Sequence, residues 1–220
     1  MENTSDPNEL PALGVLISGR GSNLQAIIDA VAAGRLKARI ALVISNRAGV
    51  LGLERAQAAN IESIVMSHRD YASRDAYDRA LAAELRRRSV RLVCLAGFMR
   101  MLGPSFCEAF PNAVLNVHPS LLPAFPGLDT HARALAAGVK LHGCTVHFVS
   151  AELDHGPIVI QAAVPVRADD TAASLAARVL RQEHVVYPRA ARWFLDGKLV
   201  IKSGVVCVEG NHEPLVFAPD

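Results

Sequence analysis

Apolar residues follow two different periods along the chain. Short continuous apolar runs are typical of strands buried on both faces, and longer segments with apolar residues at helical spacing predict helices. The predicted strands span residues 13–18, 40–44, 63–66, 90–95, 113–117, 142–149 and 158–164. The predicted helices span residues 24–33, 51–59, 74–88, 130–137 and 171–194. Up to residue 95, strand and helix alternate strictly, which predicts a mainly parallel, twisted sheet with helices on both faces.

The second half of the chain departs from this alternation. Two predicted strands lie on either side of the turn 150–157, so we expect an antiparallel pair added to the sheet. Residues 119–127 predict a loop because they contain three prolines and one glycine. We expect Asp169 or Asp170 to cap the long helix that follows them. Residues 199–207 predict a last edge strand or ribbon.

The sequence predicts a single domain. No repeat or linker divides it, and 220 residues suit a single α/β domain with a Rossmann-like sheet. We expect this domain over residues 12–205, a flexible tail at 1–11 and a C-terminal edge segment or tail at 206–220. A content of 51% hydrophobic and 20% charged residues fits a packed core and speaks against disorder.

Charge, hydropathy and cysteines narrow the class of protein. A net charge of +2 is too small to indicate nucleic acid as the main partner. No apolar run approaches the ~20 residues needed to cross a membrane, and the polar N-terminus carries no export signal. The four cysteines (Cys94, Cys107, Cys144 and Cys207) show no Cys-x-x-Cys spacing, which indicates reduced thiols and argues against a zinc site. We therefore expect a cytoplasmic protein.

A glycine-rich segment joins the first predicted strand to the first helix. It reads Ser18-Gly19-Arg20-Gly21-Ser22-Asn23-Leu24. Its glycines let the backbone approach an anion, the helix start offers free N–H groups, and Ser22 and Asn23 add side-chain donors. Leu24 stands where a dinucleotide fingerprint needs its last glycine, and no lysine follows as in a P-loop. The residues alone support a phosphate site and a tight turn without ligand equally well.

Asn116 and His118 end a predicted strand. Because they are two residues apart, their side chains point to the same face, at the sheet edge where α/β folds bind ligands. Both groups can donate hydrogen bonds to a developing oxyanion, and His can move a proton near neutral pH. The alternative is a strand-end His bonded to a backbone carbonyl, and for a lone His this alternative is favoured.

Asp154 lies in the turn between the last two predicted strands of the sheet. A carboxylate beside an imidazole stabilises its charged form, so Asp154 is a candidate partner that keeps His118 a proton donor. An ordinary turn residue is the alternative, because Asp favours turns for local backbone bonding.

Several motifs together resemble one enzyme family. The matching segments are 17–24, 95–100, 116–123, 126–128, 130–131, 142–143, 146–147, 153–154, 156–157 and 182–184. From Leu13 to about Lys202, the chain resembles the glycinamide ribonucleotide formyltransferase family, folate-dependent enzymes of purine synthesis with a Rossmann-like formyltransferase fold. The Asn-x-His and Ser-Leu-Leu-Pro elements are shared by all formyltetrahydrofolate-using formyltransferases, and the phosphate loop is the more specific part.

The resemblance implies a role for each part of the site. It implies catalysis by Asn116, His118 and Asp154. It implies contacts to the ribonucleotide from Gly21, Ser22, Asn23, Leu180, Arg181, Gln182 and Glu183. It implies a folate pocket from Arg74, Met99, Arg100, Met101, Leu102, Asn116, Ser150, Ala151, Glu152, Leu153 and Asp154. The co-substrate would be 10-formyltetrahydrofolate with no metal, the partners would be small molecules, and a monomer and a homodimer stay open.

The resemblance also implies a mechanism. The amine attacks the formyl carbon, Asn116 and protonated His118 hold the oxyanion, and Asp154 keeps His118 charged. One departure is His155, where the family usually has Gly. If the turn needs φ > 0 there, we expect a small change in the folate loop and retained activity. The extension at residues 1–11 also lies outside the family pattern.

Other functions compete with this interpretation. Methionyl-tRNA formyltransferase carries a further basic C-terminal domain, and formyltetrahydrofolate hydrolase an extra N-terminal regulatory domain, neither of which we expect here. A non-catalytic nucleotide-binding module on the same fold is disfavoured by the intact set of Asn116, His118 and Asp154. A nicotinamide-dependent oxidoreductase is disfavoured by the missing last glycine of the fingerprint.

Overall fold

The structure is a computed structural model that describes residues 10–210 and 212–218. Its strands are β1 (Ala12–Ile17), β2 (Arg39–Ser45), β3 (Ser63–Val65), β4 (Val90–Leu95), β5 (Val114–His118), β6 (Leu141–Phe148), β7 (Ile158–Pro165), β8 (Leu199–Lys202), β9 (Val205–Val208) and β10 (Leu215–Phe217). Its α-helices are α1 (Ser22–Ala32), α2 (Leu51–Ala58), α3 (Arg74–Arg86), α4 (Pro104–Ala109), α5 (Thr130–Ala136) and α6 (Ala172–Leu195). A short 3-10 helix covers His68–Asp70.

An eight-stranded sheet runs through the molecule in the order β10-β7-β6-β5-β4-β1-β2-β3. The pairs from β3 to β5 are all parallel, as predicted, whereas β5–β6 and β6–β7 are antiparallel. The chain passes from β1 to β2 on one side and later returns to β4 on the other. This reversal lies between β1 and β4, and sheets of this kind bind ligands at the carboxyl ends of the strands where the direction reverses.

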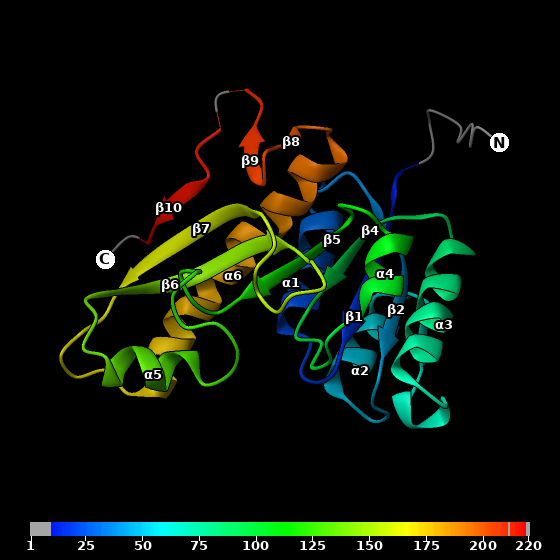
Figure 1. Cartoon of the computed structure of the whole chain (residues 1–220), viewed down its shortest axis with the longest axis horizontal. Coiled ribbons are helices and arrows are strands. Elements are labelled where there is room, and N and C mark those ends of the chain that lie inside the picture. Colours follow the sequence, from blue (N-terminus) through cyan, green and yellow to red (C-terminus); the bar gives the residue numbers. More distant parts are fainter. Residues whose placement is uncertain (1–9, 211, 219–220) are drawn as a thin grey trace.

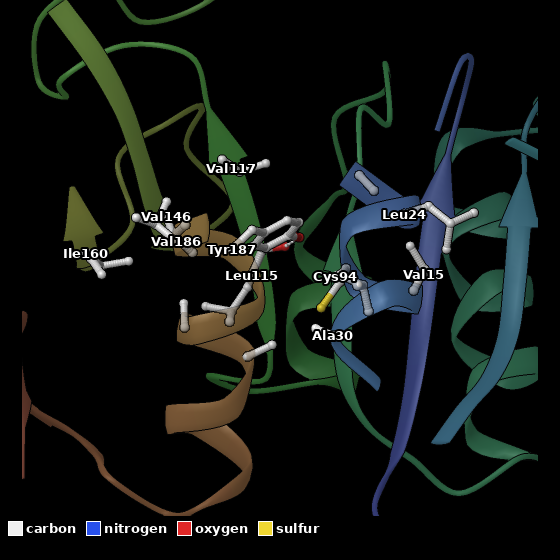
Figure 2. Packing of buried hydrophobic residues seen from close by; sticks show 14 of the residues in the cluster. Val15, Leu24, Ala30, Cys94, Leu115, Val117, Val146, Ile160, Val186 and Tyr187 are labelled. Carbon is white, nitrogen blue, oxygen red and sulfur yellow. Dashed lines mark hydrogen bonds between the residues drawn. The ribbon is translucent and has the colours of Figure 1, made fainter. Parts of the chain in front are cut away.

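Helices cover both faces of the sheet, and alternate residues of each central strand enter different cores. In β1, Val15 and Ile17 pack with α1 and α6, while Leu16 packs with α3 and α4 on the opposite face. Figure 2 shows the first of these cores, in which Tyr187 of α6 lies beside Leu115. The Tyr187 hydroxyl is 3.0 Å from the Leu95 carbonyl oxygen and 2.9 Å from that of Leu115, and this contact fixes α6 against β4 and β5.

The antiparallel addition forms the end of the sheet opposite β3. Figure 1 shows β6, β7 and β10 on the far side of the molecule from α3. The antiparallel pairing of β6 and β7 confirms the expected pair. Residues 199–207 form a ribbon, because β8 and β9 pair only with each other in a separate two-stranded sheet. The edge strand of the main sheet is β10, which pairs in parallel with β7.

The predicted cap of the long helix is wrong. Thr171 is the N-cap of α6: its hydroxyl accepts a hydrogen bond from the Ser174 amide at 3.1 Å, and the Ser174 hydroxyl accepts one from the Thr171 amide at 2.9 Å. Asp170 lies one residue too early for this role, and its carboxylate instead binds the Arg178 guanidinium at 2.7 Å. The sequence offered several cap residues in a row, and only the start of the helix distinguishes them.

The predicted tail at the start of the chain is described in part. Residues 1–9 of the predicted tail lie outside the described residues, while the Pro11 carbonyl accepts a hydrogen bond from the Arg39 amide at 3.0 Å. In the part of the chain that the structure describes, no helix is long and apolar enough to cross a membrane.

Candidate active site

Three strand ends bring the predicted site residues to one edge of the sheet. The glycine-rich loop follows β1, residues 96–99 follow β4, and β5 ends with Asn116 and His118. The Ser18 hydroxyl accepts a hydrogen bond from the Met99 amide at 2.8 Å, so the loops after β1 and β4 are in contact. Leu95 and Asn116 are paired residues of β4 and β5. The strand order therefore assembles one site from distant parts of the sequence.

The glycine-rich loop, residues 18–23, leads into α1 through a left-handed residue. Gly21 has a φ of 67°, and a Cβ atom there would lie 2.7 Å from the Gly52 Cα, so both backbone angle and space require glycine. Gly21 caps α1 without a side-chain hydrogen bond. The first-turn backbone N–H groups, including those of Ser22 and Asn23, are therefore the main donors that the loop offers to an anion.

The side chain of Asn23 binds a side chain of α6. Its Nδ2 donates a hydrogen bond to Glu183 Oε2 at 2.7 Å, and both residues are buried. Burial raises the pKa of Glu183, and the hydrogen bond from Asn23 lowers it. One amide hydrogen of Asn23 is thus used to connect the glycine-rich loop to α6.

Four consecutive residues of α6 were predicted to contact a ribonucleotide, and they point in different directions. A helix turns by about 100° per residue, so four neighbours cannot share one face. Arg181 is exposed, Leu180 and Gln182 are half-buried, and Glu183 is buried against the loop. The structure brings Glu183 into the site, and the roles of the other three stay predictions.

Three of the apolar residues predicted to form a folate pocket are exposed. Met99 is 68% exposed, Met101 45% and Leu153 49%. Leu102 differs from them, because only 4% of it is exposed and it packs in the core beside α3 and α4. The Arg100 guanidinium lies 5.8 Å from the centre of the Tyr77 ring. The roles of Met99, Met101 and Leu153 in binding a folate stay predictions, and the buried position of Leu102 leaves it only a backbone role there.

The remaining predicted folate residues lie at the start of α3 and in the turn before β7. Arg74 is the first residue of α3. The Ser150 hydroxyl donates a hydrogen bond to the Glu152 carbonyl at 3.0 Å, which closes the turn that contains Ala151. These residues are exposed or half-buried, and their contacts to a ligand stay predictions.

His118 and Asp154 meet in the structure. His118 Nδ1 lies 3.4 Å from Asp154 Oδ2, and both side chains are more than nine-tenths buried. His118 Nε2 lies 3.0 Å from the Phe125 carbonyl oxygen, to which it donates because a carbonyl only accepts. His118 therefore has both a hydrogen bond to a backbone carbonyl, which was the alternative interpretation, and the predicted acidic partner Asp154. Both ring nitrogens of His118 therefore face acceptor oxygens.

Asp154 is held in a left-handed conformation. Its φ is 54°, and its Oδ2 accepts a hydrogen bond from the Gly127 amide at 2.9 Å. The restriction that we considered for His155 therefore falls on Asp154, since His155 is not among the residues with positive φ. The His155 side chain is 62% exposed and lies 3.7 Å from Glu152 Oε1. Asp tolerates the left-handed region better than most residues, which explains how the turn forms.

His147 completes the site, although the sequence predicted no role for it. It is paired with Asn116 in the sheet, and Asn116 Nδ2 lies 3.2 Å from His147 Nε2. His147 Nδ1 lies 2.8 Å from the Phe148 carbonyl oxygen, so the proton resides on Nδ1 and Nε2 accepts from Asn116. Burial lowers the pKa of His147, which favours this neutral form. His147 therefore fixes the direction of the Asn116 amide.

The loop at residues 119–127 was predicted, but its contacts to the site were not. Thr145, which pairs with His118 in the sheet, donates its hydroxyl to the Ser120 carbonyl at 2.7 Å and accepts from the Leu122 amide at 3.0 Å. This anchor sets the loop so that Phe125 reaches His118. The spacing of Thr145 and His147 by two residues indicates that both side chains lie on one face of the strand. The sequence does not show the register with β5 that pairs them with His118 and Asn116. Among the described residues, no group of three or more His, Cys, Asp or Glu side chains is arranged to hold a metal ion.

Comparisons with known proteins identify the family of this chain. A model described as Formyl transferase matches residues 13–191. The phosphoribosylglycinamide formyltransferase of Escherichia coli is 47% identical over 200 residues, which cover 91% of this chain and 94% of that protein. The crystal structure of glycinamide ribonucleotide transformylase 1 from Symbiobacterium toebii superposes with a TM-score of 0.89 at 51% identity, covering 92% of this chain and 95% of that one.

A structure with lower sequence identity shares the fold. A formyltetrahydrofolate deformylase from Pseudomonas syringae superposes with a TM-score of 0.85 at 25% identity, covering 93% of this chain and 67% of that one. The two full-length relatives above are about twice as similar in sequence.

Proposed function

The chain belongs to the formyl transferase family, and we propose that it transfers the formyl group of 10-formyltetrahydrofolate to the amine of phosphoribosylglycinamide. The products are formylglycinamide ribonucleotide and tetrahydrofolate, in a cytoplasmic step of purine biosynthesis. Similarity over nearly the whole chain to proteins named phosphoribosylglycinamide formyltransferase and glycinamide ribonucleotide transformylase supports this formyl acceptor. The observation that carries the proposal is the meeting of Asn116, His118 and Asp154 at the carboxyl edge of the sheet.

Two separate surfaces fit the two substrates. The glycine-rich loop offers backbone N–H groups for the ribonucleotide phosphate, and Glu183 lies beside it as an acceptor for ribose or amine hydrogens. The exposed apolar side chains of Met99, Met101 and Leu153 fit the folate ring. Asn116 and His118 end β5 next to these surfaces, which suits transfer between them.

Oxyanion stabilisation is the chemistry that this site supports best. As the amine adds to the formyl carbon, negative charge develops on the formyl oxygen. The Asn116 amide, aligned by His147, has a second hydrogen for this oxygen, and His118 provides another donor. The His118 Nε2 proton now held by Phe125 would have to be redirected to the substrate, so the loop at residues 119–127 is part of the mechanism.

Asp154 supports the charge on His118. Its carboxylate faces His118 Nδ1 within a buried site, where an opposite charge is screened weakly. It also helps the proton that the amine loses to reach the leaving nitrogen. Acid–base catalysis by such a group contributes about 10²–10⁴ in rate.

The test of the proposal is a direct assay with the full chain. We expect tetrahydrofolate to form only when phosphoribosylglycinamide and 10-formyltetrahydrofolate are both supplied. Turnover without the amine would instead indicate hydrolysis, as the name of the Pseudomonas syringae structure would suggest for that protein.

The variant Asp154→Asn tests the catalytic partnership. We expect it to lower kcat by about 10²-fold or more at pH 7, because His118 loses its anionic partner. The KM for the ribonucleotide should change little, since Asp154 is not part of the glycine-rich loop. An unchanged kcat would show that Asp154 does not act through His118.

A further inference from the structure

A loop that binds a phosphate carries carbonyl oxygens as well as N–H groups. Each peptide unit has one of each, and a carbonyl that faced the phosphate would repel it. The glycine-rich loop therefore needs something that turns its carbonyls away. The glycines allow the backbone to turn, but they do not determine the direction in which each carbonyl points.

In the structure, three consecutive carbonyls of this loop already have donors. The Gly19 carbonyl accepts from the Gly52 amide at 3.0 Å, and the Gly21 carbonyl accepts from the Gln25 amide at 2.9 Å. Between them, the Arg20 carbonyl accepts from Arg55 Nε at 2.9 Å. The Gly21 bond belongs to the first turn of α1, whereas the other two donors both come from α2.

Helix α2 lies directly on the loop, which explains how it reaches these carbonyls. A Cβ atom at Gly52 would lie 2.5 Å from Ile17 Cδ1 and 3.0 Å from the Gly19 carbonyl oxygen, so the contact requires glycine. Arg55 follows Gly52 by three residues and therefore lies on the same face of α2. Packing of α2 thus delivers the guanidinium to the loop.

The guanidinium spans two elements. While Arg55 Nε donates to Arg20, its Nη1 donates to Gln25 Oε1 at 3.1 Å. Gln25 is itself held, because its Nε2 donates to Asp29 Oδ1 at 2.9 Å. The planar fork of an arginine can reach both partners at once from a fixed position, and a lysine ammonium lacks this planar geometry.

We propose that Arg55 is a positioning residue for the phosphate loop: it holds the Arg20 carbonyl on the α2 side, so that the opposite side presents N–H groups alone. This inference rests on the proposed function, in which the loop receives the phosphate of the ribonucleotide. Arg55 acts through the backbone, so its loss weakens phosphate recognition and leaves formyl transfer itself intact.

Binding of ribose 5-phosphate provides a test that needs no catalysis. The dissociation constant of this probe is measured by calorimetry for the wild-type chain, Arg55→Met, Arg55→Lys and Arg35→Met. Arg35 is an exposed residue beyond the other end of α1, so its replacement removes the same charge without touching the loop. In parallel, KM for phosphoribosylglycinamide, KM for the folate and kcat are measured.

We expect Arg55→Met to raise the dissociation constant of ribose 5-phosphate and the KM for phosphoribosylglycinamide at least about tenfold. The folate KM and kcat should stay within about twofold, as should every value for Arg35→Met. Arg55→Lys should resemble Arg55→Met, since it keeps the charge and loses the fork. Full recovery in Arg55→Lys, or wild-type binding in Arg55→Met, would overturn the proposal.

Two further measurements separate the possible failures. If Arg55→Met does not fold, Gln25→Leu removes only the second anchor of the guanidinium, and we expect about a threefold weaker binding of ribose 5-phosphate. Unchanged binding of ribose 5-phosphate by Gln25→Leu would contradict the role of the contact between Arg55 and Gln25. A wild-type chain that binds ribose 5-phosphate but transfers no formyl group refutes the proposed function and leaves this inference standing. A wild-type chain that does not bind the probe refutes the inference.

Discussion

At the scale of single residues, the site depends on side chains that orient other side chains. Asn116 has a rotatable amide, and its direction is set by His147 Nε2 at 3.2 Å. His147 can accept there because its own proton is held by the Phe148 carbonyl. Asp154 is in turn placed by the Gly127 amide. Oriented donors stabilise an oxyanion better than mobile ones because they need no reorganisation during the reaction.

Removal of His147 should therefore reduce catalysis without removing a catalytic group. We expect His147→Ala to lower kcat about tenfold, less than the 10²–10³ lost when an oxyanion donor is deleted. The measurement is kcat at saturating concentrations of both substrates, with the melting temperature as a check of folding. His155→Ala is the matched control, since that side chain is 62% exposed, and its kcat should match the wild type. Equal losses in both variants would contradict this role.

At the scale of elements, the loop after β4 is fixed by a buried carboxylate of α3. Asp78 is 1% exposed, and its Oδ2 accepts a hydrogen bond from the Gly103 amide at 2.7 Å. Burial raises the pKa of Asp78, while the bond from Gly103 and the charge of Arg74 lower it. The segment 99–103 carries the exposed methionines of the predicted folate pocket, so α3 holds this segment in place through Gly103.

Asp78→Ala should affect both stability and the folate. We expect the free energy of unfolding to fall by about 1–3 kcal/mol, because the Gly103 amide loses its buried acceptor. The folate KM should rise, while the KM for the ribonucleotide stays the same. Urea denaturation and steady-state kinetics check these two effects. Asp75→Ala removes a carboxylate that is 54% exposed and should change stability by less than about 0.5 kcal/mol.

At the scale of the whole molecule, buried histidines create a pH-dependent stability. The antiparallel addition buries His142, whose Nε2 lies 3.2 Å from His131 Nδ1. Burial, followed by the charge of His131, lowers the pKa of His142 to about 4. Burial also lowers the pKa of His131 and of His147. His131 belongs to α5, whereas His142 and His147 both lie in β6, and only the closed fold removes them from water.

Stability should therefore decrease with acidification. Between the ordinary histidine pKa of about 6.5 and the folded value of about 4 for His142, the unfolded chain binds more protons than the folded one. The free energy of unfolding should fall as pH drops through this window and level off for this residue below it. Urea denaturation across the window measures the slope, which should be shallower for His142→Asn. An identical slope in that variant would show that His142 does not contribute.

The elements show how far the sequence alone could predict the structure. Strands buried on both faces and amphipathic helices were predicted within a few residues of their bounds, because their patterns repeat over several turns or pleats. The short helix α4 was not predicted, since six residues carry too little periodicity. The cap of α6 was predicted at the wrong residue, because Asp170 and Thr171 are both good caps.

The sequence by itself determined the alternating strands and helices and the three catalytic candidates, since hydrophobic period and residue chemistry are local properties of the chain. Only the tertiary structure decided how these residues are connected. The pairing of Asn116 with His147, the bond of Asn23 to Glu183 and the reach of Arg55 to Arg20 depend on strand order, register and helix packing. These follow from the burial of whole faces against one another, which no local segment of the chain encodes.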